Sequence, residues 1–102
     1  MCFGIKLKSG FFKTQRYMLE ISKNRIILTP GEKEGSSKQI VISDSDLVAV
    51  EMVEKDSNKV ELEFNTKNGI YTGTLDIDVN IDNFIATFSR ELGKRFSIAY
   101  YK

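Results

Sequence analysis

The chain has 102 residues, 41% of them hydrophobic, and its 15 basic and 14 acidic side chains leave a net charge of +1. This length predicts one domain over residues 1–102, and the charge is far below the basicity typical of nucleic-acid-binding domains. No apolar run approaches the roughly 18 residues of a membrane span, and we identify no signal peptide. The low charge leads us to expect no binding to nucleic acid. The single cysteine, Cys2, cannot form an internal disulfide, so we expect a reduced, cytoplasmic protein.

Apolar and polar residues alternate along most of the first 75 residues, which is the pattern of half-buried strands. Seven strands are predicted, over residues 3–8, 16–21, 25–29, 38–43, 47–54, 59–65 and 70–75. A polar loop, TPGEKEGSSK (29–38), and a turn, TKNG (66–69), interrupt the alternation. The nearly continuous hydrophobicity of residues 47–54 predicts a central strand.

After residue 75 the period of the apolar residues becomes that of a helix. Five of them fall on one helical face: Ile81, Phe84, Ile85, Phe88 and Leu92. We therefore predict an amphipathic helix over 81–92 with Phe84, Ile85 and Phe88 buried. Asn80 suits its N-cap and Gly93 its C-terminal end.

A bent antiparallel sheet leaves an open end that such a helix can cover. We thus expect a mainly β (α+β) fold, with an antiparallel seven-stranded bent sheet or barrel capped by one C-terminal helix.

An apolar tail, residues 96–102, continues beyond the predicted helix. It contains four candidate partner-binding residues: Phe96, Ile98, Tyr100 and Tyr101. An ordered apolar tail must bury itself, either on its own domain or on a second copy of the chain. The first choice makes the tail part of the fold, and the second makes it a contact with a protein partner or within a homo-oligomer.

The order of elements over residues 3–92 and the segment FKTQRYMLEI resemble the pleckstrin-homology (PH) superfold, in the form of a remote bacterial-type PH-like domain. In that family a basic residue, an arginine and an aromatic residue commonly open the second strand, and Lys13, Arg16 and Tyr17 are in these places. The family's helix usually carries a tryptophan, whose space Phe84 or Phe88 would fill here.

The resemblance also implies that basic residues around the first hairpin meet phosphoinositide head groups on an anionic membrane surface. The candidate anion-binding residues are Lys6, Lys8, Lys13, Arg16 and Lys23. Six basic residues and one acidic residue occur among the first 31 positions, which favours encounters with anions. The same residues equally suit the solvated outer face of a strand pair.

Catalysis is not expected, because the chain lacks histidine, the usual general base near neutral pH, and Cys2 has no histidine to activate it. The segment DIDVNID (76–82) places oxygen ligands at every second residue, as calcium loops begin. However, Ile81 stands where that loop needs glycine, and Thr87 stands where it needs glutamate. We therefore predict no metal site and no cofactor.

These observations favour a non-enzymatic binding or scaffold module, which contacts a protein through an edge strand or a groove beside the helix. The alternative is binding of an anionic lipid head group by the basic first hairpin. The two differ in salt dependence, because head-group binding weakens with ionic strength whereas apolar strand pairing persists.

Overall fold

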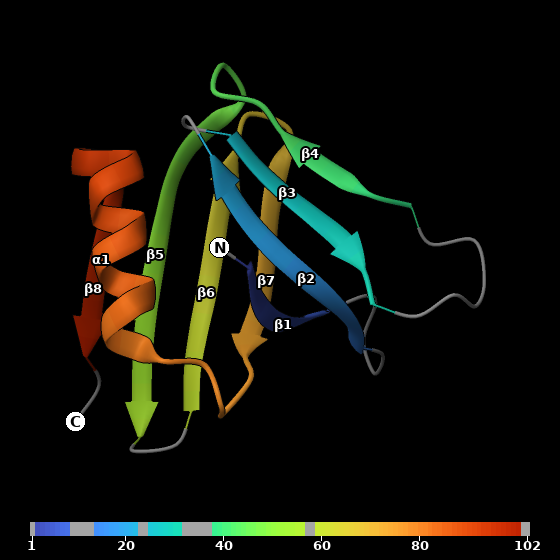
Figure 1. Cartoon of the computed structure of the whole chain (residues 1–102). Coiled ribbons are helices and arrows are strands. Elements are labelled where there is room, and N and C mark those ends of the chain that lie inside the picture. The colour runs from blue at the N-terminus through green and yellow to red at the C-terminus, as the bar shows by residue number, and fades with distance from the viewer. Residues whose placement is uncertain (1, 9–13, 23–24, 32–37, 57–58, 101–102) are drawn as a thin grey trace.

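The computed structural model describes residues 2–8, 14–22, 25–31, 38–56 and 59–100 (Figure 1). The described residues form eight strands: β1 (Cys2–Lys8), β2 (Thr14–Ser22), β3 (Arg25–Pro30), β4 (Ile40–Ile42), β5 (Leu47–Asp56), β6 (Lys59–Thr66), β7 (Gly69–Leu75) and β8 (Phe96–Tyr100). The helix α1 spans Ile81–Leu92, and a 3-10 turn, η1 (Gly93–Arg95), joins it to β8.

All eight strands belong to one open sheet in the order β4-β3-β2-β1-β7-β6-β5-β8. Each neighbouring pair is antiparallel except β5 and β8, which run parallel. The mainly β class and the C-terminal helix are confirmed. The prediction of a purely antiparallel sheet of seven strands was wrong, because the sheet is mixed and has eight strands, and it does not close into a barrel.

The additional strand comes from the segment predicted as an apolar tail. Parallel neighbours require a crossover connection, and the chain supplies it through β6, β7 and α1 before β8 returns beside β5. β8 pairs with residues Val50–Glu54 of β5. Consequently β5 lies inside the sheet, but one strand from its edge rather than at its centre.

The alternation predicted for the strands is confirmed, since the inward residues of β1 and β2 are buried: Phe3, Ile5, Leu7, Tyr17, Leu19 and Ile21. Phe84 and Phe88 of α1 are fully buried, and their rings stack with centroids 4.2 Å apart. Phe3 meets Phe84 edge-on at 5.0 Å. Ile85, predicted to be buried, is only partly so and packs at the margin of this core.

The ends of α1 are set by the residues that the sequence indicated. The Asn80 side chain accepts a hydrogen bond from the Asn83 backbone N–H at 3.0 Å, which satisfies a donor of the first turn. Gly93 has φ of 58°, and its N–H donates to the Ser89 carbonyl. A positive φ is accessible to glycine without steric cost, so the helix ends here and the chain turns toward β8.

Figure 1 shows the sheet bending so that β2 and β3 cross in front of β6 and β7, while α1 lies beside β5 and β8. The core fills the space between these parts. In the described ranges, no helix has both the length and the apolar character needed to cross a membrane.

Candidate functional site

Three of the predicted anion-binding residues lie on the outer face of the first two strands. Lys6 of β1 is directly opposite Arg16 of β2, and Lys8 is opposite Thr14. All of these side chains are exposed, because their neighbours in sequence take the inward positions. The structure thus brings Lys6 and Arg16 together, whereas Lys13 and Lys23 lie outside the described residues.

Arg16 has a carboxylate partner that is distant in sequence. Its Nη2 donates to Asp76 Oδ2 at 2.5 Å, and the side chains of Arg16 and Asp76 are 50% and 11% exposed. Asp76 follows β7 and is held by its backbone N–H, which donates to the Gly4 carbonyl at 3.0 Å. A Cβ at Gly4 would overlap with Asp76 Oδ2, so the carboxylate reaches Arg16 only because residue 4 lacks a side chain.

Two residues of the calcium-like pattern are already used in the fold. Asp76 binds Arg16, and Asn80 caps α1. Within the described part of the chain, no three acidic, cysteine or histidine side chains are grouped so that they could hold a metal ion. The ion pair and the helix cap therefore account for Asp76 and Asn80 of this pattern.

The Arg16–Asp76 pair separates two hollows in the surface. One, of about 370 Å³, lies beside the start of α1 and is lined by residues that include Cys2, Met18, Asn80 and Asn83. The other, of about 430 Å³, is lined by residues that include Lys6, Thr74 and Ile77. Arg16, Asp76 and Asp78 line both.

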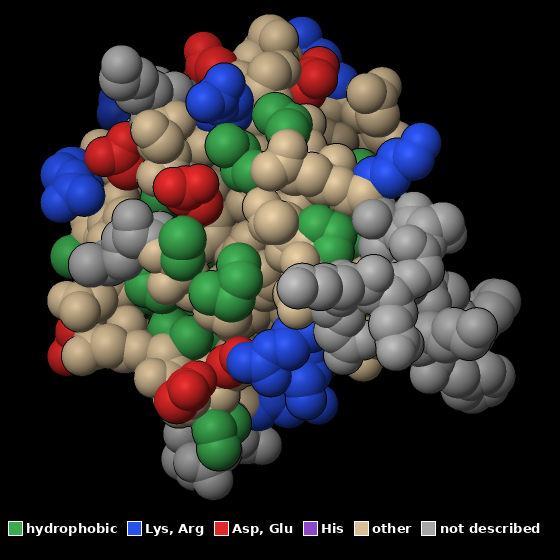
Figure 2. All heavy atoms as spheres, turned by 45° about the vertical axis from the view of Figure 1, so that its right-hand side comes forward, with side chains coloured by type: hydrophobic (Ala, Val, Ile, Leu, Met, Phe, Trp, Pro, Cys, Tyr) green, Lys and Arg blue, Asp and Glu red, His purple; other side chains and the backbone are tan. Residues whose placement is uncertain are grey.

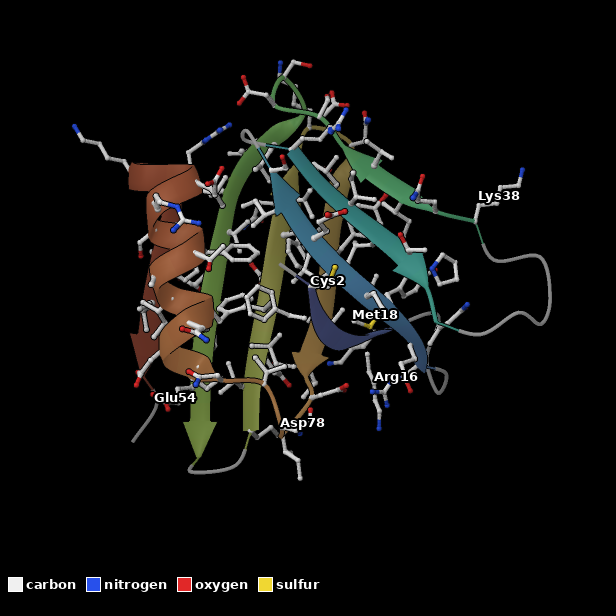
Figure 3. All side chains as sticks on the ribbon, in the orientation of Figure 1. Cys2, Arg16, Met18, Lys38, Glu54 and Asp78 are labelled. Carbon is white, nitrogen blue, oxygen red and sulfur yellow. The ribbon has the colours of Figure 1, made fainter. Side chains whose placement is uncertain are left out.

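Both hollows are lined by basic and acidic side chains. Figure 2 shows basic and acidic side chains in contact at the lower end of this face. In Figure 3, Arg16 projects from near the start of β2, and Asp78 lies on the connection between β7 and α1. Because Lys6 and Arg16 face Asp76 and Asp78, this region is not a simple anion site.

We expect Asp76→Asn to strengthen binding to anionic vesicles several-fold, because the change frees the Arg16 guanidinium and removes a repelling carboxylate. The gain should disappear as salt is raised, since exposed charges are screened. Vesicle co-sedimentation over a salt series measures both effects. Asp78→Asn is the matched control, because it removes the same charge from the same hollows without breaking the ion pair. Equal gains in the two variants would show that net charge, not Arg16, controls binding.

The predicted partner-binding residues lie in the last strand. Phe96 and Ile98 of β8 are partly buried against the core, and the Phe96 ring is 5.7 Å from that of Phe88. The tail therefore docks on its own chain through this face. The backbone of Tyr100 is part of β8, but its side chain and all of Tyr101 lie outside what the structure describes.

Arg95 holds the start of β8 in place, and sequence reasoning missed it. Its guanidinium donates to Asp44 Oδ1 at 2.7 Å, to the Asp44 carbonyl at 3.3 Å and to the Leu47 carbonyl at 3.2 Å. These contacts tie η1 to the turn before β5, about fifty residues earlier. A single arginine after a predicted helix carries no signal for such a contact.

The two edges of the sheet differ in how well they are protected. β4 has three residues, and short edge strands offer few backbone groups for pairing. β8 has five residues, FSIAY, without a charged residue or a proline, and its register with β5 is uninterrupted. In the described strand order nothing pairs with the far side of β8. β8 is therefore the better template for an added strand.

No protein-family model matches the chain, and no curated protein sequence matches it.

Proposed function

We propose that this protein is a non-enzymatic binding module that takes an extended segment of a protein partner as an additional strand along β8. The observation that supports the proposal is the β8 edge, which is uncharged and lacks a pairing strand in the described sheet. An exposed sheet edge binds through main-chain hydrogen bonds, and side chains at alternate positions provide specificity.

The side chains of β8 suit strand addition on both faces. Phe96 and Ile98 face inward and stay partly exposed, so they offer apolar contacts to every second residue of a partner. Ser97 and Ala99 take the outer face, where their small size does not hinder an approaching strand. Arg95 fixes the start of β8 before the partner arrives, which lowers the entropy lost on binding.

The absence of histidine from the sequence supports a binding role over an enzymatic one. We also propose that the fold is PH-like: the bent sheet followed by a C-terminal helix supports this, and β8 is an addition to the expected seven strands. Anionic-lipid binding is the second candidate function. The juxtaposition of Lys6 and Arg16 favours it, but the Asp76 carboxylate opposes it.

The test uses a peptide selected from a displayed random library against the intact protein. In an NMR titration we expect saturable amide shifts concentrated in 96–100 and the adjoining β5. Ser97→Lys should weaken binding on the order of tenfold, because a charge on an edge strand opposes further pairing. The new lysine lies beside Glu51 in register, so the fold should tolerate it.

Val41→Lys is the matched control, because it places the same charge on the other edge strand at a side chain that is 52% exposed. It should leave binding unchanged. If Val41→Lys weakens binding and Ser97→Lys does not, the β8 proposal is wrong and the β4 edge is the binding surface. Amide shifts confined to Lys6, Arg16 and Asp76 would instead indicate that the peptide binds in the hollows.

A further inference from the structure

We infer that the partner for which β8 is best suited is a second copy of this chain, with the two β8 strands antiparallel across a two-fold axis at Ile98. The inference rests on the proposed function, because it uses the same sheet edge. Most soluble homo-oligomers are closed and symmetric, and a two-fold interface uses the same surface on both copies. An edge strand can form such an interface if it is compatible with itself.

Charge is the first requirement of self-pairing. In a two-fold arrangement a charged residue near the axis meets its own copy, and like charges opposite one another destabilise a strand pair. β8 has no charged residue between Phe96 and Tyr100, so this repulsion is absent at its centre. The net charge of +1 also gives little long-range repulsion between two molecules.

Side-chain size is the second requirement. Pairing all five residues of β8 puts Ile98 opposite Ile98 of the second copy, on the face that contacts the core. Ser97 then lies opposite Ala99 of the second copy, on the outer face. Directly opposite residues in an antiparallel pair have Cα atoms about 4.5–5.5 Å apart, which two small side chains accommodate easily.

The other edge explains why the assembly would stop at two copies. When the two β8 strands pair, neither is an edge strand any longer, and the two β4 strands become the edges of the combined sheet. β4 offers three residues, too few for an extensive ladder. The inference therefore specifies a closed dimer with one continuous sheet, rather than a fibre.

The register can be tested by disulfide trapping in a Cys2→Ser background. Ser97→Cys and Ala99→Cys are prepared separately, each is confirmed to fold by circular dichroism, and they are oxidised alone or mixed. A disulfide needs Cα atoms closer than about 7 Å, which only the mixed 97–99 pair satisfies. Identical positions would be offset by two residues along the strands, about 8 Å apart.

We expect the mixture to cross-link several-fold faster than either variant alone. Light scattering should give twice the monomer mass for the unmodified protein and for Val41→Lys, and the monomer mass for Ser97→Lys. A monomer at all concentrations, or equal cross-linking in all three samples, would overturn the inference. If a monomer still binds the library-selected peptide at β8, the self-pairing fails while the proposed function stands. If the peptide does not bind at β8 either, both fail.

Discussion

Replacing Phe88 by alanine is expected to lower the free energy of unfolding by about 3–5 kcal/mol. The Phe88 side chain is fully buried, and its ring packs against those of Phe84, Phe96 and Phe3 at 4.2, 5.7 and 6.3 Å. Its removal leaves a cavity bordered by three elements, and the neighbouring rings cannot all move to fill it. Urea denaturation followed by circular dichroism measures the loss.

Ile77→Ala is the control for this experiment, because Ile77 is 88% exposed on the connection between β7 and α1. It should change the free energy of unfolding by no more than about 0.5 kcal/mol. A loss below about 1 kcal/mol for Phe88→Ala would mean that the helix does not seal the core as the structure shows.

The second large effect is expected for Gly73→Ala, at about 1–3 kcal/mol of lost stability. A Cβ on Gly73 would lie 2.8 Å from Leu7 Cδ2, 2.9 Å from Ile5 Cδ1 and 2.9 Å from the Lys6 carbonyl. Two of these atoms belong to buried core side chains and the third is backbone, so β1 and β7 would have to separate. The same denaturation measurement applies, with the midpoint shifted to lower urea.

Gly31→Ala is the matched control, because a Cβ there would lie 3.5 Å from its nearest neighbour, the Arg16 carbonyl, which is an ordinary contact. Its effect should stay within about 0.5 kcal/mol. Equal stabilities for Gly73→Ala and the unmodified protein would contradict the close packing of β1 against β7.

Local patterns were sufficient to predict the helix and most of the strands. The stripe through Phe84 and Phe88 and the ends at Asn80 and Gly93 are properties of neighbouring residues, so the sequence alone locates α1. β8 was missed as a strand because alternation over residues 96–100 shows which side chains share a face, but not which strand lies alongside. The choice of neighbouring strand depends on where α1 and η1 place the chain before it enters β8.

The candidate sites were predictable to a smaller extent. Strand alternation placed Lys6 and Arg16 on one outer face, and the structure agrees. The Asp76 carboxylate that binds Arg16 could not be inferred, because the contact requires the chain just after β7 to lie beside Gly4 of β1. A glycine within an otherwise alternating strand was the one available signal, since it often marks a close approach of another segment.

The pairing of β1 with β7 also has a consequence for how the chain folds as it is made. β2 follows β1 closely in the sequence, so these two strands can pair early in synthesis. The other neighbour of β1 is β7, where Leu75 pairs with Ile5 and is synthesised some seventy residues later. Contacts this distant in sequence slow folding, to the order of milliseconds to seconds in β-rich domains. During that interval the lysines at positions 6 and 8 put positive charge on the open edge of β1. Charged edge strands resist pairing with other chains. Charge at these two positions therefore disfavours pairing of β1 with another chain before β7 is in place.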